Sequence, residues 1–211
     1  MKIEIWSDVV CPFCYIGKRH FEKALEQFAG KDDVQIEWKS FLLNPAMKTD
    51  PEKNITEYLA EIKGISLQQA SEMNAHVSKM AEGAGLQYDF SKVVMANSYN
   101  AHRLIQFAKQ HSLADAVEER LFRAYFIEGK NIDNEGVLIS IANETGLDGE
   151  AVAHVLSEKK LSAEVNADIG EAQQLGIRGV PFFVVDRKFG ISGAQPVEVF
   201  IETLEKAARG D

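Results

Sequence analysis

The sequence predicts an α/β fold in which a block of helices interrupts a small sheet. Strand-like segments lie near both ends of the 211 residues, whereas helical periodicity fills the middle of the chain. A pair of cysteines, Cys11 and Cys14, lies at the first expected strand–helix junction. We therefore expect residues 1–43 and 160–211 to form one α/β domain, and residues 44–159 to form a helical domain inserted into it.

The N-terminal segment has the pattern of a strand, a helix and a second strand. Residues 2–7 are mostly apolar, as in a buried strand. Phe21 and Leu25 place an apolar stripe on the helix after the cysteines, and we expect Gly30 to end this helix. Residues 34–38 alternate with period two, as a half-buried strand does. A segment this short is typical of one right-handed parallel unit.

Helical signals dominate the central segment. Ser66 and Gln69 have the spacing of a capping box, and Asp133 and Asp148 lie where N-caps are expected. Apolar residues recur at helical intervals, which predicts that they pack in a core: Ala70, Met73, Val77, Met80 and Ala84. Further helices are expected at residues 97–111, 114–128, 134–145 and 148–157.

The C-terminal segment returns to strand patterns. A helix at about 161–175 leads to Gly179-Val180-Pro181, and the run after it, residues 182–185, is rich in β-forming side chains. Residues 189–193 have the pattern of a second short strand, and a last helix begins after Pro196. The predicted order is therefore β-α-β, a helical block, and α-β-β-α.

Composition and charge exclude several classes of function. The chain is 45% hydrophobic and 26% charged, and its net charge is −9 with no block of basic residues. Nucleic acid and anionic membranes are therefore not expected partners. The first residues are strand-like and lack a signal-peptide pattern, and no apolar run approaches the ~20 residues of a membrane span. We therefore expect a cytoplasmic protein. In the cytoplasm an isolated cysteine pair is typically catalytic or metal-binding.

The placement of the cysteines favours thiol–disulfide chemistry. Cys11 lies over the unpaired N–H groups that open a helix, where the helix dipole favours a thiolate. Pro12 suits the first helical turn because it has no N–H to satisfy there. Cys14, one turn later, can resolve a mixed disulfide formed by Cys11. Two alternatives remain: half of a metal site, although zinc usually needs four protein ligands, or two inert buried thiols. We expect no metal.

Three stretches of the chain resemble the DsbA family of thioredoxin-fold oxidoreductases, in particular its FrnE-like cytoplasmic branch: Ser7–Lys18, Asn97–Leu104 and Gly176–Phe183. The resemblance implies a thioredoxin-like fold with a large all-helical domain inserted between its second and third strands. It also implies that Cys11 attacks, that Cys14 resolves, and that a cis-Pro181 borders the substrate groove.

The same resemblance suggests which residues contact the substrate. The backbone of Val180 would pair with an extended substrate peptide as an added strand. Pro12 and Phe13 would flank the reactive thiol. Phe13 stands where strongly oxidising members of the family carry His, and this difference predicts a more reducing thiol pair. Thioredoxin-like enzymes often have a buried acid six positions before the first cysteine, and here that position is Ile5.

The stretch around residue 100 has two interpretations. Arg103 could hold a substrate carboxylate, with Asn97 and His102 beside it. Alternatively Asn97 caps a helix while His102 and Arg103 anchor that helix to its neighbours. We favour the structural role, and we keep the three residues as candidate substrate contacts.

The predicted function is that of a cytoplasmic dithiol–disulfide oxidoreductase, a reductase or isomerase without metal or organic cofactor. Its expected substrates are disulfide-containing proteins or small-molecule thiol compounds, with glutathione as a candidate co-substrate and a homodimer allowed by the resemblance. The alternative is a glutathione-dependent transferase or isomerase, because kappa-class glutathione transferases and 2-hydroxychromene-2-carboxylate isomerases share this fold branch. Those proteins carry Ser where this chain has Cys11. A non-catalytic peptide-binding module is a further alternative.

Overall fold

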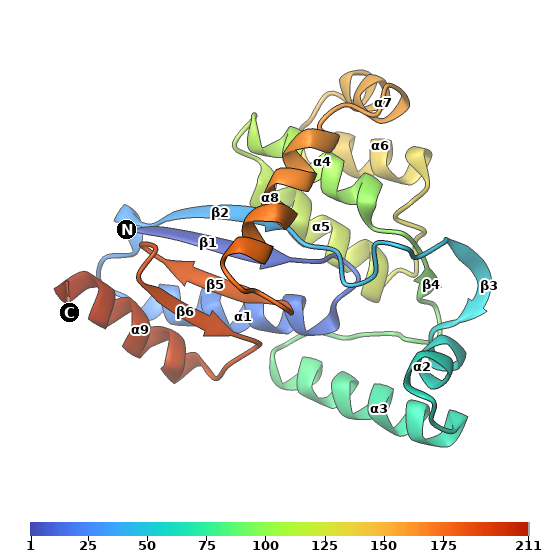
Figure 1. The fold of residues 1–211 in the computed structure, drawn as a ribbon, viewed down its shortest axis with the longest axis horizontal. Helices are drawn as coiled ribbons and strands as arrows, with labels where there is room; N and C mark the ends of the chain where they lie inside the picture. Colours follow the sequence, from blue (N-terminus) through green and yellow to red (C-terminus); the bar gives the residue numbers. More distant parts are fainter. Residues whose placement is uncertain (211) are drawn as a thin grey trace. The chain divides into compact units, whose positions relative to one another are not determined.

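The computed structural model describes residues 1–210, which divide into two compact units (Figure 1). The first unit comprises Met1–Leu43 together with the described residues from Leu161 onward. The second is one continuous segment, Asn44–Lys160. The predicted order of strands and helices in the first unit is found, and each unit is described by itself below.

A mixed four-stranded sheet in the order β2-β1-β5-β6 forms the centre of the first unit. β1 pairs in parallel with β2 and antiparallel with β5, and β6 continues the sheet antiparallel to β5. The two central strands therefore come from opposite ends of the sequence. The strands are β1 (Lys2–Ser7), β2 (Gln35–Ser40), β5 (Phe182–Val185) and β6 (Phe189–Ser192).

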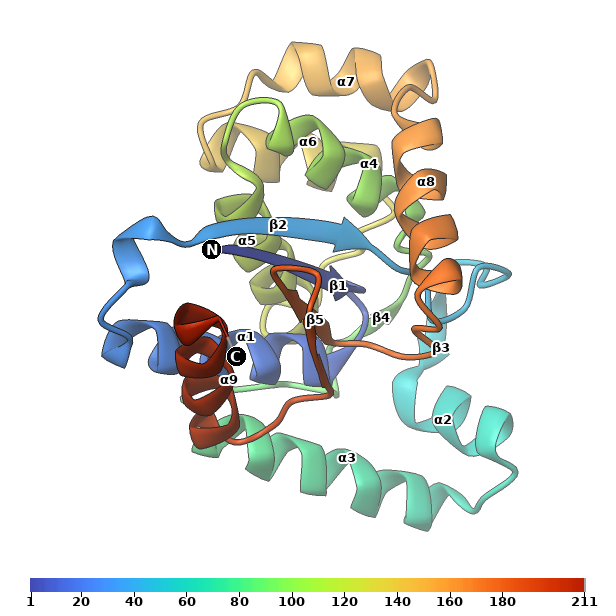
Figure 2. The ribbon, with the colours of Figure 1, turned by 60° about the vertical axis from the view of Figure 1, so that its left-hand side comes forward.

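Helices cover both faces of this sheet, as Figure 2 shows, with α1 and α9 on one side and α8 on the other. On the first side Phe21 of α1, Phe183 of β5 and Phe200 of α9 lie with ring centroids 4.8–6.0 Å apart. On the second side Trp6 and Val184 pack in a cluster with residues of α8 and the following loop. The helices are α1 (Pro12–Gln27), the 3₁₀ turn η1 (Lys31–Asp33), α8 (Ser162–Gln174) and α9 (Val197–Arg209).

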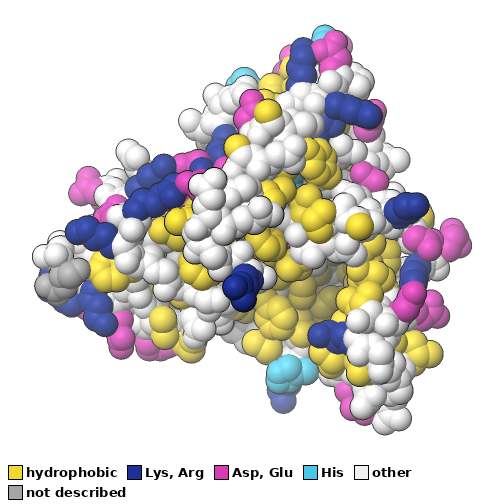
Figure 3. All heavy atoms as spheres, viewed as in Figure 1, with side chains coloured by type: hydrophobic (Ala, Val, Ile, Leu, Met, Phe, Trp, Pro, Cys, Tyr) yellow, Lys and Arg dark blue, Asp and Glu magenta, His cyan; other side chains and the backbone are white. Residues whose placement is uncertain are grey.

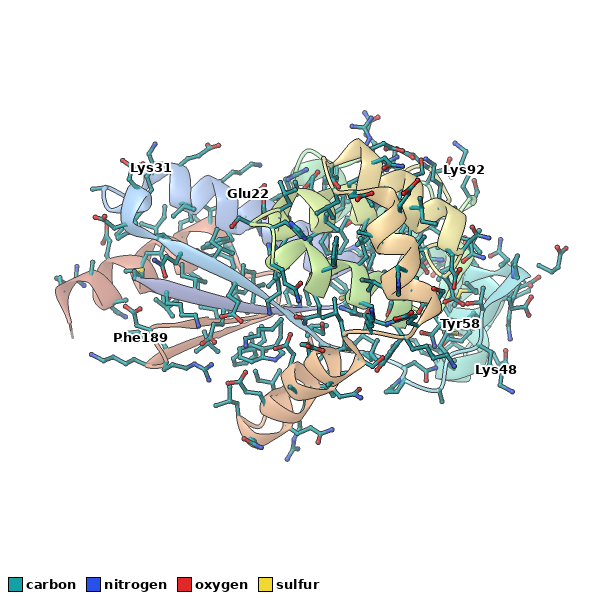
Figure 4. All side chains as sticks on the ribbon, turned by 90° about the horizontal axis from the view of Figure 1, so that it is seen from above. Glu22, Lys31, Lys48, Tyr58, Lys92 and Phe189 are labelled. Carbon is teal, nitrogen blue, oxygen red and sulfur yellow. The ribbon has the colours of Figure 1, made fainter. Side chains whose placement is uncertain are left out.

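The face toward α8 also holds charged side chains. Glu4 is buried in β1 and pairs with Arg187, which also contacts Glu171 at 2.7 Å. Lys39 of β2 lies 3.2 Å from both Asp168 and Glu171 of α8. These ion pairs join α8 to the sheet. Figure 3 shows basic and acidic side chains beside one another on part of the visible face. In Figure 4, seen from above, the label of Phe189 marks the start of β6.

The second unit is mostly helical, but it also contains a short antiparallel strand pair that the sequence did not predict. β3 has the sequence Asp-Pro-Glu-Lys-Asn, which lacks the apolar alternation of a typical strand. Its strand conformation therefore depends on pairing with β4, in which Val94 lies opposite Asn54. The expectation of an all-helical insertion is corrected accordingly. The elements are β3 (Asp50–Asn54), α2 (Ile55–Lys63), α3 (Leu67–Gly83), β4 (Val94–Met95), α4 (Tyr99–Lys109), α5 (Ala114–Phe126), α6 (Glu135–Glu144) and α7 (Gly149–Ser157).

Three local expectations differ from the structure. α1 ends at Gln27 rather than at Gly30, because its C-cap Phe28 already has an extended backbone. Asn134, not Asp133, caps α6 by accepting a hydrogen bond from the Val137 N–H. The exposed fractions of Met73 and Met80 on α3 are 40% and 37%, so neither is a core residue. Helical spacing identifies a common face, but the neighbouring elements decide whether that face is covered.

Candidate active site

The two cysteines lie where β1 gives way to α1. Cys11 is the N-cap of α1, Pro12 is its first residue, and the Cys14 N–H donates to the Cys11 carbonyl at 3.0 Å. The turn before the helix is closed by the Cys11 N–H, which donates to the Asp8 carbonyl at 2.9 Å. The first thiol therefore sits at the N-terminus of α1, the positive end of the helix dipole.

The loop before β5 lies directly against the first thiol. The Cys11 Sγ donates to the Val180 carbonyl oxygen at 3.5 Å, although the two residues are 169 positions apart. The Val180–Pro181 peptide bond is cis, and the Pro181 carbonyl accepts a hydrogen bond of 2.8 Å from the Gly193 N–H. The structure thus brings together Cys11, Val180 and Pro181, which the sequence named as parts of one site.

Access to the site differs among its residues. Phe13, between the cysteines, is 38% exposed, whereas Cys11 and Cys14 are 3% and 1% exposed. Pro12 and Val180 are half-buried. Phe13 thus presents an exposed aromatic side chain beside a recessed thiol.

Cys14 is held as a neutral thiol. Complete burial, followed by the hydrogen bond and the charge of neighbouring Cys11, raises the pKa of Cys14 well above the ordinary range of a thiol. The Asp8 backbone N–H and the Ser7 hydroxyl act in the opposite direction and lower this pKa. The two thiols are therefore in contact but differ in environment, one at a helix start and one in the interior.

Asp8 is a residue of the site that the sequence analysis missed. Its side chain is buried, and its carboxylate accepts hydrogen bonds from the Leu43 N–H at 2.8 Å and from the Val10 N–H at 3.4 Å. It thereby fixes the turn before Cys11 to the chain that leaves β2. An Asp three positions before the first cysteine was visible in the sequence, but its partner Leu43 depends on the tertiary fold.

Asn97, His102 and Arg103 lie in the second unit, at the start of α4. The Asn97 side chain accepts from the Tyr99 N–H at 2.8 Å and donates to the Met47 carbonyl at 2.7 Å. His102 is buried within α4. Arg103 donates to the Leu156 carbonyl at 3.1 Å, where α7 ends.

The remaining contacts of Arg103 also belong to the chain itself. Its guanidinium donates to the Lys160 carbonyl at 2.7 Å, to the Asn100 side chain at 3.0 Å and to the Val155 carbonyl. Burial lowers the pKa of Arg103. These contacts satisfy carbonyls at the C-terminus of a helix, as a structural residue does.

The helices of the structure can be compared with the requirements of a membrane span. Among the helices of residues 1–210, none combines the length and the apolar character that crossing a bilayer requires.

Comparisons with known proteins agree with this architecture. A family model for the DSBA-like thioredoxin domain matches residues 2–205. The uncharacterized protein YwbO of Bacillus subtilis (strain 168) is 30% identical over 211 residues, covering 96% of this chain and 94% of that protein. The crystal structure of the probable DsbA oxidoreductase SCO1869 from Streptomyces coelicolor is 37% identical with a TM-score of 0.93, covering 100% of this chain and 91% of that one.

A more distant structure shares the fold. The cytosolic disulfide reductase DsbM from Pseudomonas aeruginosa is 19% identical with a TM-score of 0.68, and the match covers 100% of both chains. The predicted thioredoxin-like fold is confirmed by these matches. The chain therefore belongs to the DsbA-like thioredoxin family, a family of oxidoreductases and isomerases.

Proposed function

We propose that this protein is a cytoplasmic dithiol–disulfide oxidoreductase that reduces or isomerises disulfides through Cys11 and Cys14. One observation carries the proposal: the Cys11 thiol lies at the start of α1 and within 3.5 Å of the Val180 carbonyl, with Cys14 buried in contact with it. A substrate that reaches Cys11 meets a backbone edge at the same point.

The proposed cycle exchanges one disulfide for another. The Cys11 thiolate attacks one sulfur of a substrate disulfide, the S–S bond breaks, and the first substrate thiolate leaves. The Cys14 thiolate then attacks the Cys11 sulfur, which releases the second substrate thiolate. The substrate has gained two electrons and the protein has lost two, now held as a Cys11–Cys14 disulfide. Two molecules of a thiol such as glutathione reduce that disulfide and close the cycle.

The environment of Cys14 supports this order of events. Two of the causes that raise the Cys14 pKa come from Cys11, its hydrogen bond and its charge. Both disappear once Cys11 is bonded to the substrate, because a disulfide sulfur carries no negative charge. Cys14 then ionises more readily, so the resolving thiol becomes reactive after the mixed disulfide has formed.

The compartment and direction of electron flow belong to the same proposal. DsbM, which shares the fold, is described as a cytosolic disulfide reductase. Phe13 supplies no positive charge beside Cys11. A thiol pair without such a neighbour is expected to be more reducing, which suits reduction or isomerisation in a compartment rich in glutathione.

Substitution of each cysteine tests the proposal. The wild-type protein should reduce the disulfides of insulin with glutathione as electron donor, and Cys11→Ser should abolish turnover. Cys14→Ser should accumulate a mixed disulfide through Cys11, detected by non-reducing electrophoresis and mass spectrometry of tryptic peptides. Ser140→Ala is the control, because its exposed hydroxyl donates to Glu144 in the second unit and its loss leaves both thiols and their neighbours unchanged.

Other outcomes separate the alternatives. A glutathione-dependent transferase or isomerase would keep its activity in Cys14→Ser, since that chemistry has no resolving step. A peptide-binding module would bind its ligand equally well in Cys11→Ser. Either result would overturn the proposal.

A further inference from the structure

Gly17 occupies an unexpected place in α1. It is buried in the middle of a helix of 16 residues, six positions after Cys11. Glycine is among the least favourable residues in a helix interior, because it loses the most backbone freedom on folding. Gly17 has an ordinary helical backbone and is not among the residues with positive φ. Its presence therefore calls for a reason other than backbone conformation.

The surroundings of Gly17 supply that reason. A Cβ at this position would lie 2.9 Å from Cγ of Pro181, a distance that real Cβ atoms essentially never show. It would also lie 3.5 Å from Cα and 3.6 Å from Cβ of Ala194. The Pro181 ring is closed on its own backbone, so it cannot rotate away as a flexible side chain does. A methyl group at residue 17 would push the loop before β5 away from α1.

Two hydrogen bonds hold the segments that meet at the contact between Gly17 and Pro181. The Pro181 carbonyl accepts from the Gly193 N–H at 2.8 Å, which joins the loop before β5 to the turn after β6. His20, one turn after Gly17 on α1, contacts the Gln195 carbonyl through Nδ1 at 2.8 Å. The ring of Pro181 is thus held between Gly17 and the turn that contains Ala194.

We propose that Gly17 is a positioning residue of the disulfide reaction: the missing side chain lets Pro181 lie against α1 and holds the Val180 carbonyl beside the Cys11 thiol. The inference rests on the proposed function. Since Val180 precedes Pro181 directly, displacement of the ring moves the carbonyl that lies 3.5 Å from Cys11 Sγ. A small displacement of a substrate-aligning group can lower a rate strongly.

The test compares Gly17→Ala with Gly170→Ala. Gly170 lies inside α8, and among the described residues no heavy atom outside its own helix and neighbours would lie within 4 Å of a Cβ there. Gly170→Ala should raise the urea midpoint slightly, because alanine favours a helix, and should leave insulin reduction unchanged. Gly17→Ala should lower both the midpoint and kcat/KM, the latter by about ten-fold or more.

A double-mutant cycle with Pro181→Ala identifies the partner, because that substitution removes Cγ. In the Pro181→Ala background, Gly17→Ala should raise the urea midpoint instead of lowering it, and should change kcat/KM by less than about two-fold. If Gly17→Ala alone does not fold, recovery of folding in the double variant supports the inference, and failure to recover overturns it.

Two results contradict the inference in folded variants. One is a Gly17→Ala variant that keeps wild-type kcat/KM and gains stability as Gly170→Ala does. The other is an equal loss in both backgrounds, which would mean that the effect does not pass through Pro181. The urea midpoints need no enzymatic activity. A wild-type protein unable to reduce insulin would therefore overturn the proposed function, while the midpoints would still decide whether residue 17 acts through Pro181.

Discussion

At the scale of single residues, the two thiols are distinguished by depth and by neighbours. Cys11 begins a helix and meets the Val180 carbonyl, whereas Cys14 is fully buried and its pKa is raised, first by burial and then by Cys11. The folded protein therefore binds the Cys14 proton more tightly than the unfolded chain does. This difference links the stability of the reduced protein to pH.

Stability of the reduced protein should fall in alkaline solution. The contribution of Cys14 is fully present below the ordinary thiol pKa of about 8.5 and is lost above it, by at most about 1.4 kcal/mol per pH unit. Urea unfolding of the reduced wild-type protein and of Cys14→Ser, from neutral pH to about pH 10, measures the effect. As the pH rises, the free energy of unfolding should fall more steeply for the wild type than for Cys14→Ser. Parallel curves would contradict the raised pKa.

Residue 13 should set the redox potential of the pair. A protonated His at this exposed position would stabilise the Cys11 thiolate and hence the dithiol form. We expect the wild-type potential to lie well below about −120 mV, the value of a strong oxidant, and Phe13→His to raise it by about 30 mV or more. Glutathione titration measures both, and Phe13→Leu serves as the uncharged control. A wild-type potential near −120 mV would refute the prediction.

Residues of the site were predictable to different degrees. Cys11, Cys14 and Pro181 are visible in the sequence because their spacing and flanking residues form recognisable patterns. Asp8 and Gly17 were missed, because their roles depend on Leu43 and Pro181, which only the tertiary fold brings near. Long-range partners of this kind leave no local signal.

At the scale of secondary-structure elements, the Arg103 side chain links the packed helices α4 and α7. Arg103 of α4 donates to the Leu156 and Val155 carbonyls at the end of α7 and to the Lys160 carbonyl beyond it. Carbonyls at a helix end have no partner within the helix, so a planar guanidinium with several donors can satisfy more than one of them.

Replacement of Arg103 should weaken the second unit without changing the chemistry. Arg103→Met removes a guanidinium that donates to three backbone carbonyls and to Asn100, and it should lower the free energy of unfolding by about 3 kcal/mol. Arg103→Lys should lose about half as much, because an ammonium group cannot span the same acceptors. Urea unfolding gives these values. Insulin reduction per folded molecule should stay near the wild-type level, whereas a large rise in KM would favour a substrate-binding role.

Most elements could be predicted from periodicity, and the exceptions have physical causes. The expected helix at 148–157 corresponds to α7 (Gly149–Ser157), where Asp148 accepts hydrogen bonds from two backbone N–H groups. β3 was missed because its four polar residues and one proline become a strand only through pairing with β4. Met73 and Met80 were expected in a core, but spacing alone does not say whether a helical face is covered.

At the scale of the whole molecule, the two units differ in how the chain builds them. The second unit is one continuous segment with its own buried core, whereas the sheet of the first unit needs strands from both ends of the chain. Continuity in sequence favours independent folding, since the contacts that stabilise such a segment are local.

Expression of isolated fragments tests this difference. A fragment of residues 44–160 should show a helical circular dichroism spectrum and cooperative thermal unfolding, while a fragment of residues 1–43 should remain unfolded. The fragment of residues 1–43 contains β1 and β2 but lacks β5, the antiparallel neighbour of β1. An isolated two-stranded pair is at best marginally stable in water. A cooperatively folded N-terminal fragment would contradict the prediction.

The position of β1 between β2 and β5 also governs how the protein is made. Synthesis from the N-terminus delivers Cys11 169 positions before Val180. During that interval the nascent Cys11 thiol lacks the Val180 carbonyl that it contacts in the folded protein. The nascent chain is thus open to oxidation and to pairing with other thiols, and a reducing environment protects it until that segment follows.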